Sequence, residues 1–406
     1  MKKFFATLLA LAMVLSLAAC GGNDAPASND GGSQSTDAQQ PAETPTETPA
    51  GSASGTFKLG GIGPLTGGAA IYGNAAMNGA KIAVDEINAL GSGVTFEFQA
   101  EDDQHTPDIS VNAYNTLMDW GMQILIGTVT TGPCIAVAAE TNNDRVFTMT
   151  PSASSTDVIA GKDNTFQVCF TDPNQGTGSA DYISQNMPGA KVAIIYKNDD
   201  AYSQGVRDTF VAEAAKVGVE IVSETTFNES TKTEFSVQLT AAKSAGADLI
   251  FLPMYYEPAS VILTQADQMG YAPTFFGIDG MDGILTQPGF DTSLAEGVML
   301  LTPFSADAAD ERTQSFVAKY NELYGETPNQ FAADGYDAVY IVYSALQAAG
   351  CTGDMSAADI CEALIAVMPT ITVDGLTGQG MTWASTGEVS KAPMAVVIKD
   401  GVYVTP

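Results

Sequence analysis

From Thr56 onward, short apolar segments with the pattern of strands alternate with longer segments with the pattern of helices. The first strand is expected at 57–62, and the helix that follows, whose apolar residues recur every three or four positions, closes at Gly91. The same alternation returns after residue 174, and it is typical of parallel sheets with helices on both faces. Further strands are expected at 94–100, 122–127, 191–196, 219–226, 248–252 and 274–276, and helices at 107–120, 203–217 and 234–245.

The length of this alternating region predicts two lobes, because about 350 residues are many for a single hydrophobic core. The formal net charge of the whole chain is −31. A chain this acidic repels nucleic acid and anionic lipid, so we expect neither as a partner.

The N-terminus has the layout of a secretory signal. Lys2 and Lys3 precede an apolar run at 4–17, which is too short to span a bilayer, and small residues then lead to Cys20. This end resembles the bacterial lipobox, which implies a lipoprotein signal peptide at 1–19 and a lipid on Cys20. An ordinary signal peptide is the alternative.

Residues 21–55 contain no Val, Ile, Leu, aromatic, Lys or Arg residue. Such a segment buries too little apolar surface to offset the entropy lost on ordering. We therefore expect residues 20–55 to be a disordered tether between the anchor and the folded region.

Four cysteines remain after Cys20, and four allow three complete pairings. Cys351 and Cys361 flank a short turn, so a local disulfide between them is one expectation in an oxidising compartment. Two buried free thiols are the alternative expectation for Cys134 and Cys169.

Two loops rich in hydroxyl groups, at 128–133 and 150–156, each follow an expected strand and precede a helix. Ligands of open α/β sheets lie beyond the carboxyl ends of the strands. Hydroxyls together with free N–H groups at a helix N-terminus make a carboxylate site, although helix capping alone is the other reading. Two such loops in succession favour a shared ligand.

Asp279 lies in a glycine-flanked loop after the strand at 274–276, where its carboxylate can pair with a ligand ammonium or form an Asx turn. Tyr72, Tyr202 and Tyr255 occupy loops of the same kind. Tyrosine suits the wall of a cleft, because it offers apolar area with a polar tip.

Catalysis finds little support in the sequence. The single histidine, His105, lies beside two aspartates in what we interpret as a solvated loop, and G-x-S-x-G, H-E-x-x-H and C-x-x-C are absent. The glycine-rich turn at 63–67 matches neither phosphate-binding motif. We therefore predict no enzymatic activity, no cofactor and no metal.

Three motifs occur in a fixed order: GPLTG at 63–67, MTPSA at 149–153 and FGIDG at 276–280. In this order they resemble the branched-chain amino-acid ABC transporter substrate-binding lipoproteins, and the likeness runs from Thr56 to Pro406. It implies the type I periplasmic-binding-protein fold, an α/β fold in which two doubly wound lobes are joined by a three-crossover hinge. By this resemblance the first lobe is 56–172 with 302–370, the second is 173–301 with 371–406, and the lobes close about hinges near 172, 302 and 371.

The resemblance also implies a ligand site. Thr131, Ser152 and Ser154 match the positions that hold the ligand α-carboxylate, and Thr130 is their neighbour. Asp279 matches the partner of the α-ammonium, although the family often has the longer Glu there. The matching aromatic positions are Tyr72, Tyr202, Tyr255 and Phe331. His105 and Thr130 stand about where Gram-negative members have the two cysteines of a small disulfide.

These expectations describe a protein on the extracellular face of the cell membrane, anchored through Cys20. It would capture a small amino acid, branched-chain or related, and deliver it to the transmembrane subunits of an ABC permease. The alternatives are a sensing domain of the same fold for an amide- or urea-like molecule, and a secreted enzyme. An enzyme would need a nucleophile and base pair that the sequence does not offer.

Overall fold

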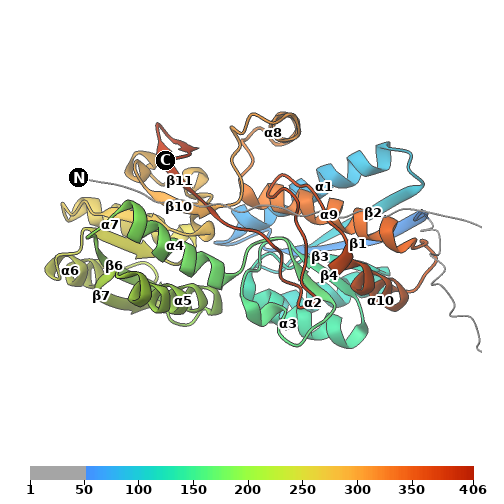
Figure 1. Cartoon of the computed structure of the whole chain (residues 1–406), viewed down its shortest axis with the longest axis horizontal. Helices are drawn as coiled ribbons and strands as arrows, with labels where there is room; N and C mark the ends of the chain where they lie inside the picture. The colour runs from blue at the N-terminus through green and yellow to red at the C-terminus, as the bar shows by residue number, and fades with distance from the viewer. Residues whose placement is uncertain (1–51) are drawn as a thin grey trace, which may run out of the picture. The chain divides into compact units, whose positions relative to one another are not determined.

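A computed structural model of the protein describes residues 52–406, which form two parallel-type sheets with helices packed on them (Figure 1). The predicted signal peptide at 1–19, Cys20 and the tether up to residue 51 lie outside the described residues. The strands are β1 (Gly55–Gly63), β2 (Val94–Asp102), β3 (Ile124–Gly127), β4 (Phe147–Thr150), β5 (Thr165–Gln167), β6 (Lys191–Lys197), β7 (Glu220–Phe227), β8 (Leu249–Leu252), β9 (Thr274–Gly277), β10 (Met299–Thr302), β11 (Met394–Lys399) and β12 (Val402–Val404).

As far as β9 the α-helices alternate with the strands as the sequence predicted, except between β4 and β5, and the last three α-helices follow one another between β10 and β11. The α-helices are α1 (Ala70–Ala89), α2 (Pro107–Trp120), α3 (Thr131–Asp144), α4 (Asp172–Asn186), α5 (Ala201–Val217), α6 (Ser236–Ser244), α7 (Tyr256–Gln268), α8 (Glu311–Tyr324), α9 (Gln330–Ala349) and α10 (Ala357–Val367). Short 3-10 turns are η1 (Thr156–Val158), η2 (Glu229–Thr231), η3 (Asp279–Met281), η4 (Ile284–Thr286), η5 (Thr292–Ala295) and η6 (Met368–Thr370).

The first sheet has five strands in the order β2-β1-β3-β4-β5, all parallel. The second has seven in the order β12-β11-β10-β9-β8-β6-β7, and only β11 and β12 run antiparallel to their neighbours. We call the first sheet with α1–α3 and α8–α10 the first lobe, and the second sheet with α4–α7 the second lobe. Buried apolar strands such as β3 and β8 are what a sheet covered on both faces requires.

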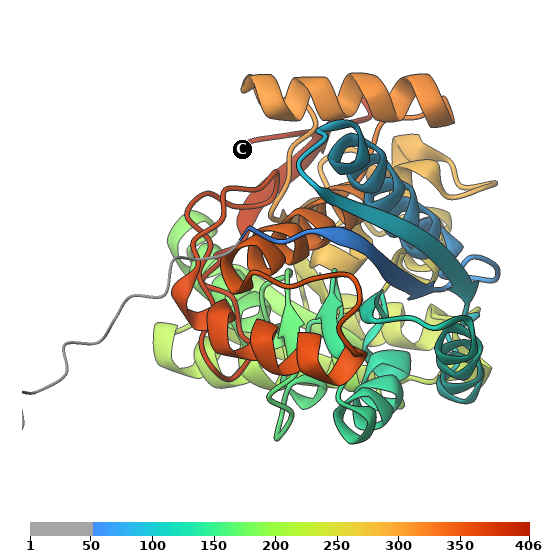
Figure 2. The same ribbon diagram turned by 90° about the vertical axis from the view of Figure 1, so that its right-hand side faces the viewer.

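Close packing of α1 against α9 fixes the two helices that carry Tyr72 and Phe331. A Cβ atom placed on Gly79 of α1 would lie 1.8 Å from the Ala332 carbonyl oxygen, and one on Gly335 of α9 would lie 2.0 Å from that of Ala76. Only glycine allows the two backbones to approach this closely. Figure 2 shows α8 beside α1, at the top of that view.

The chain crosses between the sheets three times, after β5, after β10 and before β11 (Figure 1). The first two crossings adjoin the predicted hinges at 172 and 302. The third lies later than the predicted residue 371, because the Trp383 indole donates to the Gln167 carbonyl (2.9 Å) and Gly387 also pairs with Gln167 of β5. Isolated hydrogen bonds, rather than a continuous ladder of strand pairing, join this segment to β5. Its sequence therefore lacks the alternating pattern of a strand.

The folded region also begins earlier than the predicted end of the tether at residue 55. Ala53 is buried, and the Ser54 amide donates to the Cys351 carbonyl over 3.1 Å. Backbone pairing, rather than apolar side chains, holds these residues, which explains why their composition resembles that of the tether.

The cysteines of the described region, Cys134, Cys169, Cys351 and Cys361, are all buried free thiols. The expected disulfide between Cys351 and Cys361 is therefore wrong, and free thiols are found at Cys134 and Cys169. Cys351 follows the end of α9 and Cys361 lies within α10, and both pack into the apolar core of the first lobe as small hydrophobic residues. Within residues 52–406, the helices are too short or too polar to cross a membrane.

Candidate functional site

One small cavity lies between the two lobes. All nine residues that the sequence proposed as ligand contacts line it, together with Val129 and Gly280. The nine are Tyr72, Thr130, Thr131, Ser152, Ser154, Tyr202, Tyr255, Asp279 and Phe331.

The first lobe contributes neutral hydroxyl groups, from the loops that follow β3 and β4. Thr130 and Thr131 stand at the start of α3, whose first-turn N–H groups have no partner inside the helix. The Ser152 hydroxyl donates to the Val129 carbonyl over 2.6 Å, which ties the two loops together. This side of the cavity offers hydroxyls and a helix N-terminus. Together they can stabilise an anionic group of a ligand, and no cationic side chain of the protein is needed.

Ser154 adjoins a buried carboxyl that the sequence did not indicate as a site group. Asp172, in the first turn of α4, is 1% exposed, and both of its carboxyl oxygens lack a hydrogen-bond partner among the described residues, as does the Ser154 hydroxyl. Burial raises the pKa of Asp172 well above its usual value, although the nearby Ser154 hydroxyl acts in the opposite direction. The sequence signal that could have indicated Asp172 is its place directly before a proline, in the first turn of a helix.

The second lobe contributes one carboxyl, that of Asp279. It accepts a hydrogen bond from the Tyr202 hydroxyl, and its backbone amide donates to Gln175 Oε1 over 3.2 Å. Burial raises the pKa of Asp279 to about 6, against the hydrogen bonds from Tyr202 and Gln175, which lower it. Asp279 is therefore ionised at neutral pH and able to pair with a cation, and Gln175 is a supporting residue that the sequence missed.

Aromatic rings form the remaining wall. The Tyr72 ring centroid lies 5.6 Å from that of Tyr255 and 4.5 Å from that of Phe331, and Tyr202 stacks on Tyr255 at 4.9 Å with 18° between the ring planes. Rings at these separations attract each other beyond the area that they bury. The wall is thus a packed cluster, with the hydroxyls of Tyr72 and Tyr202 directed to polar partners in η3.

The two lobes are bonded directly to each other around this cavity. The Tyr72 hydroxyl donates to the Gly280 carbonyl, and the Tyr256 hydroxyl donates to that of Gly68 over 2.7 Å. The Gln330 side chain of α9 donates to the Asp279 carbonyl over 2.7 Å. The cavity itself measures about 10 Å³, enough for about one water molecule. The structure is therefore a closed form of the cleft.

His105 contacts two of the residues that line this site, contrary to the interpretation of its position as a solvated loop. Its Nδ1 atom lies 2.9 Å from the Thr130 hydroxyl oxygen, and its ring meets that of Tyr255 edge-on, with centroids 5.4 Å apart. Burial lowers the pKa of the His105 imidazole. The two residues expected at the family's cysteine positions are thus joined by a polar contact.

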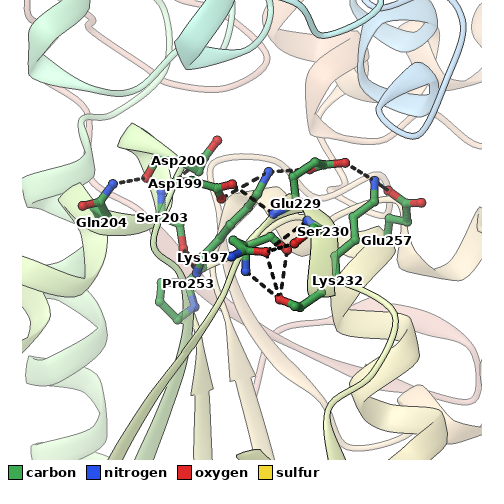
Figure 3. A network of polar contacts seen from close by, with 12 residues as sticks. Lys197, Asp199, Asp200, Ser203, Gln204, Glu229, Ser230, Lys232, Pro253 and Glu257 are labelled. Carbon is green, nitrogen blue, oxygen red and sulfur yellow. Dashed lines mark hydrogen bonds and ion pairs between the residues drawn. The ribbon is translucent and has the colours of Figure 1, made fainter.

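A row of alternating charges lies on the second lobe beside the cleft (Figure 3). Lys197 pairs with Glu229 at 2.7 Å, Glu229 with Lys232 at 2.8 Å, and Lys232 with Glu257 at 3.1 Å. Asp200 caps α5 by accepting from the Ser203 amide. Both lysines are thus held by carboxylates. Among the described residues, the lining of the ligand cavity includes no Lys, Arg or His.

The part of the chain that the structure describes contains no cluster of side chains suited to bind a metal ion. Residues 52–406 contain no group of three or more His, Cys, Asp or Glu side chains placed to hold a metal ion. The predicted absence of metals and cofactors remains a prediction.

Comparison with known proteins identifies the family of the chain and its fold. A family model described as periplasmic binding protein matches residues 56–401. The Leu/Ile/Val-binding protein homolog 3 of Brucella melitensis biotype 1 is 30% identical over 338 residues, which cover 82% of this chain and 88% of that protein. This family is one of solute-binding proteins rather than of enzymes.

Solved structures with the same architecture include two amino-acid-binding proteins. The leucine binding protein LivK of Thermotoga maritima MSB8 is 26% identical, with a TM-score of 0.77 over 86% of this chain and 97% of that one. The branched-chain amino acid transporter substrate binding protein LivJ of Streptococcus pneumoniae, in complex with isoleucine, is 27% identical, with a TM-score of 0.77 over 87% and 100%. They confirm the predicted likeness and the type I periplasmic-binding-protein fold. The chain therefore belongs to the periplasmic binding protein family and is an ABC transporter substrate-binding protein.

Proposed function

We propose that this protein captures a small zwitterionic amino acid between its lobes and delivers it to the transmembrane subunits of an ABC permease. The observation that carries the proposal is the polarity of the small cavity lined by the nine predicted residues. Neutral hydroxyls and a helix N-terminus line its first-lobe side, and the Asp279 carboxyl lines its second-lobe side. An amino acid presents the complementary pair of charges, an α-carboxylate and an α-ammonium.

The roles of the nine residues follow from this pairing. Thr131, Ser152 and Ser154 would hold the α-carboxylate, with Thr130 beside them and fixed by His105. Asp279 would accept the α-ammonium while Tyr202 and Gln175 hold its orientation. The remaining lining residues, Tyr72, Tyr255 and Phe331, would enclose the ligand side chain.

Loading requires the lobes to separate. A cavity of about 10 Å³ cannot hold an amino acid, and the hydrogen bonds of Tyr72 to Gly280 and of Tyr256 to Gly68 join the two lobes. Three crossing segments with few interlobe bonds suit a hinge motion. We propose that the ligand enters an open form and that its contacts with both lobes then stabilise closure.

The experiment is isothermal titration of purified protein with L-leucine, L-isoleucine, L-valine and L-alanine, after mass spectrometry of any compound that co-purifies. Unfolding and refolding first removes such a compound. The proposal predicts micromolar or tighter binding of at least one of these amino acids, and loss of binding for the matching amine and the matching carboxylic acid. Equal binding of the amine or of the acid would contradict it.

An amide- or urea-like ligand is the second candidate, because burial holds the pKa of Asp279 at about 6 and Tyr202 already donates to this carboxyl. Such a carboxyl also accepts the N–H groups of a neutral amide. The family fold accepts ligands without an ammonium too, since a relative from R. palustris, 21% identical with a TM-score of 0.77, was solved with benzoate. Acetamide, urea and benzoate therefore belong in the same titration series.

The remaining parts of the proposal concern location. The family match places the protein outside the cytoplasm, in the periplasmic or extracellular space. We propose that a lipid on Cys20 anchors it to the extracellular face of the cell membrane, with residues 20–51 as the tether. Support comes from the run of small residues before Cys20 and from the composition of 21–55.

A further inference from the structure

A second and much larger cavity lies beside the second crossing between the lobes. It measures about 730 Å³, within the range of small-molecule sites. Its walls come from both lobes and from the crossing segment: Ile71 of α1 and Val317 of α8 on one side, Leu285 of η4 and Val402 of β12 on the other, and Phe304 at the crossing. Two walls that belong to different lobes make this an interlobe pocket, which we call the crossing cavity.

The crossing cavity combines apolar walls with negative charge. Asp282, Asp307 and Glu326 line it, and among the described residues its lining includes neither Lys, Arg nor His. The field inside is therefore negative, and the net charge of −31 adds to it. A cation with an apolar body has the matching chemistry.

Asp282 gives the cavity a specific polar anchor. Its side chain is 4% exposed, and its Oδ2 atom accepts a hydrogen bond from the Gln330 amide over 2.9 Å. Burial raises the pKa of this carboxyl, while the nearby Tyr403 hydroxyl, which also lines the cavity and adjoins the carboxyl as a donor, lowers that pKa. Neither Asp282 Oδ1 nor the Tyr403 hydroxyl makes a hydrogen bond of ordinary geometry with a described residue. A buried acceptor whose only nearby donor is poorly placed is costly, and a better-placed donor supplied by a ligand would lower that cost.

We propose that the crossing cavity is a second ligand site for a small organic ammonium ion with an apolar or aromatic body. The ammonium pairs with Asp282 Oδ1, and the body packs against Ile71, Leu285 and Phe304. The site does not depend on the proposed amino-acid ligand of the cleft.

The crossing cavity is separate from the cleft but adjoins it. Within residues 52–406, the two linings share no residue. Gln330 connects them, because its backbone amide bonds Asp282 and its side chain bonds the Asp279 carbonyl. A test must therefore distinguish binding in the crossing cavity from binding in the cleft.

The probe is 2-(4-fluorophenyl)ethylamine, titrated by fluorine NMR into the protein freed of co-purifying ligand, with 2-(4-fluorophenyl)acetamide as the matched neutral compound. Val317→Trp fills the crossing cavity from α8 without touching the cleft. Asp282→Asn removes the charge and keeps the shape. Thr131→Ala alters the cleft alone. Thermal unfolding establishes that each variant is folded.

The proposal predicts that the amine binds at least tenfold more tightly than the amide, that Val317→Trp abolishes this binding, and that Thr131→Ala leaves it unchanged. Asp282→Asn should lower the affinity for the amine at least tenfold and leave the affinity for the amide unchanged. Absence of amine binding, equal binding of the two probes, or binding that survives Val317→Trp would overturn the proposal. If Asp282→Asn does not fold, Val317→Trp and the comparison of probes decide alone.

Discussion

The Tyr72 hydroxyl of α1 donates a hydrogen bond to the Gly280 carbonyl of η3, so a residue of the first lobe bonds the second lobe directly across the candidate site. The Tyr256 amide donates to the same Tyr72 oxygen over 3.1 Å. Tyr72 thus joins the two lobes by hydrogen bonds and also forms part of the cavity wall. A ligand larger than a water molecule can enter only when these interlobe hydrogen bonds break.

We predict that ligand-free protein samples an open form and that ligand closes it. Small-angle scattering should give a smaller radius of gyration at saturating ligand than without it. Tyr72→Phe removes the interlobe hydrogen bonds of the Tyr72 hydroxyl but keeps the ring. The ligand-free variant should therefore have a larger radius of gyration than ligand-free wild type. An unchanged radius for wild type with verified ligand bound would count against hinged lobes.

The Asp279 carboxyl predicts how affinity depends on pH. Its pKa in the folded protein is raised to about 6, so the group is ionised above this pH and protonated below it. An α-ammonium binds the ionised form, so affinity should be flat above about pH 7 and fall toward pH 5 as the carboxyl becomes protonated. Titration calorimetry between pH 5 and 8 measures this, and Asp279→Asn is the control, which should lose the dependence.

The contact between His105 and Thr130 should contribute measurably to the stability of the first-lobe loops. A double-mutant cycle of His105→Ala and Thr130→Ala in chemical denaturation should give a coupling free energy of about 0.5–1.5 kcal/mol, the usual net value of a neutral hydrogen bond. Coupling indistinguishable from zero would mean that the contact does not hold the loops together in solution.

Cys20→Ser tests the anchor. The variant should leave the membrane fraction and appear in the soluble extracellular fraction, because no lipid can then be attached. Ligand affinity should match that of the wild type, since the folded region starts more than thirty residues later. Retention of the variant protein in washed membranes would exclude a lipid on Cys20 as the anchor.

Much of the fold was predictable because its signals are local. Strands such as β3 and β8 are short apolar runs, and helix ends such as those at Gly121 and Gly218 carry the left-handed glycine that stops a helix. The position of the third crossing was not predictable, because Trp383 contacts β5 through one isolated hydrogen bond to Gln167. The pairing of Ser54 with Cys351 was missed for the same reason, as backbone hydrogen bonds leave no pattern of side chains.

The loops at strand ends indicated the hydroxyl groups, Asp279 and the tyrosines, the family resemblance added Phe331, and the nine proposed residues line one cavity. His105, Asp172 and Gln175 were missed because each acts through a neighbour: Thr130, Ser154 and Asp279 respectively. Supporting contacts of this kind depend on tertiary distances, and a single sequence does not contain them. The disulfide expected between Cys351 and Cys361 failed for a related reason, since closeness in sequence does not orient two side chains toward each other.

The measurement that tests the account most directly compares Asp279→Asn with Thr131→Ala by isothermal titration, using the amino acid that binds wild type best. Asp279→Asn leaves a cation without its buried partner, which typically costs about 3–5 kcal/mol, or roughly two to three and a half decades in affinity. Thr131→Ala removes one neutral hydroxyl from the carboxylate side and should cost less, about 1.5–3 kcal/mol. We predict a larger loss of affinity for Asp279→Asn than for Thr131→Ala. Binding by Asp279→Asn within about twofold of wild type would contradict the ammonium role, and with it the proposal that the ligand is an amino acid.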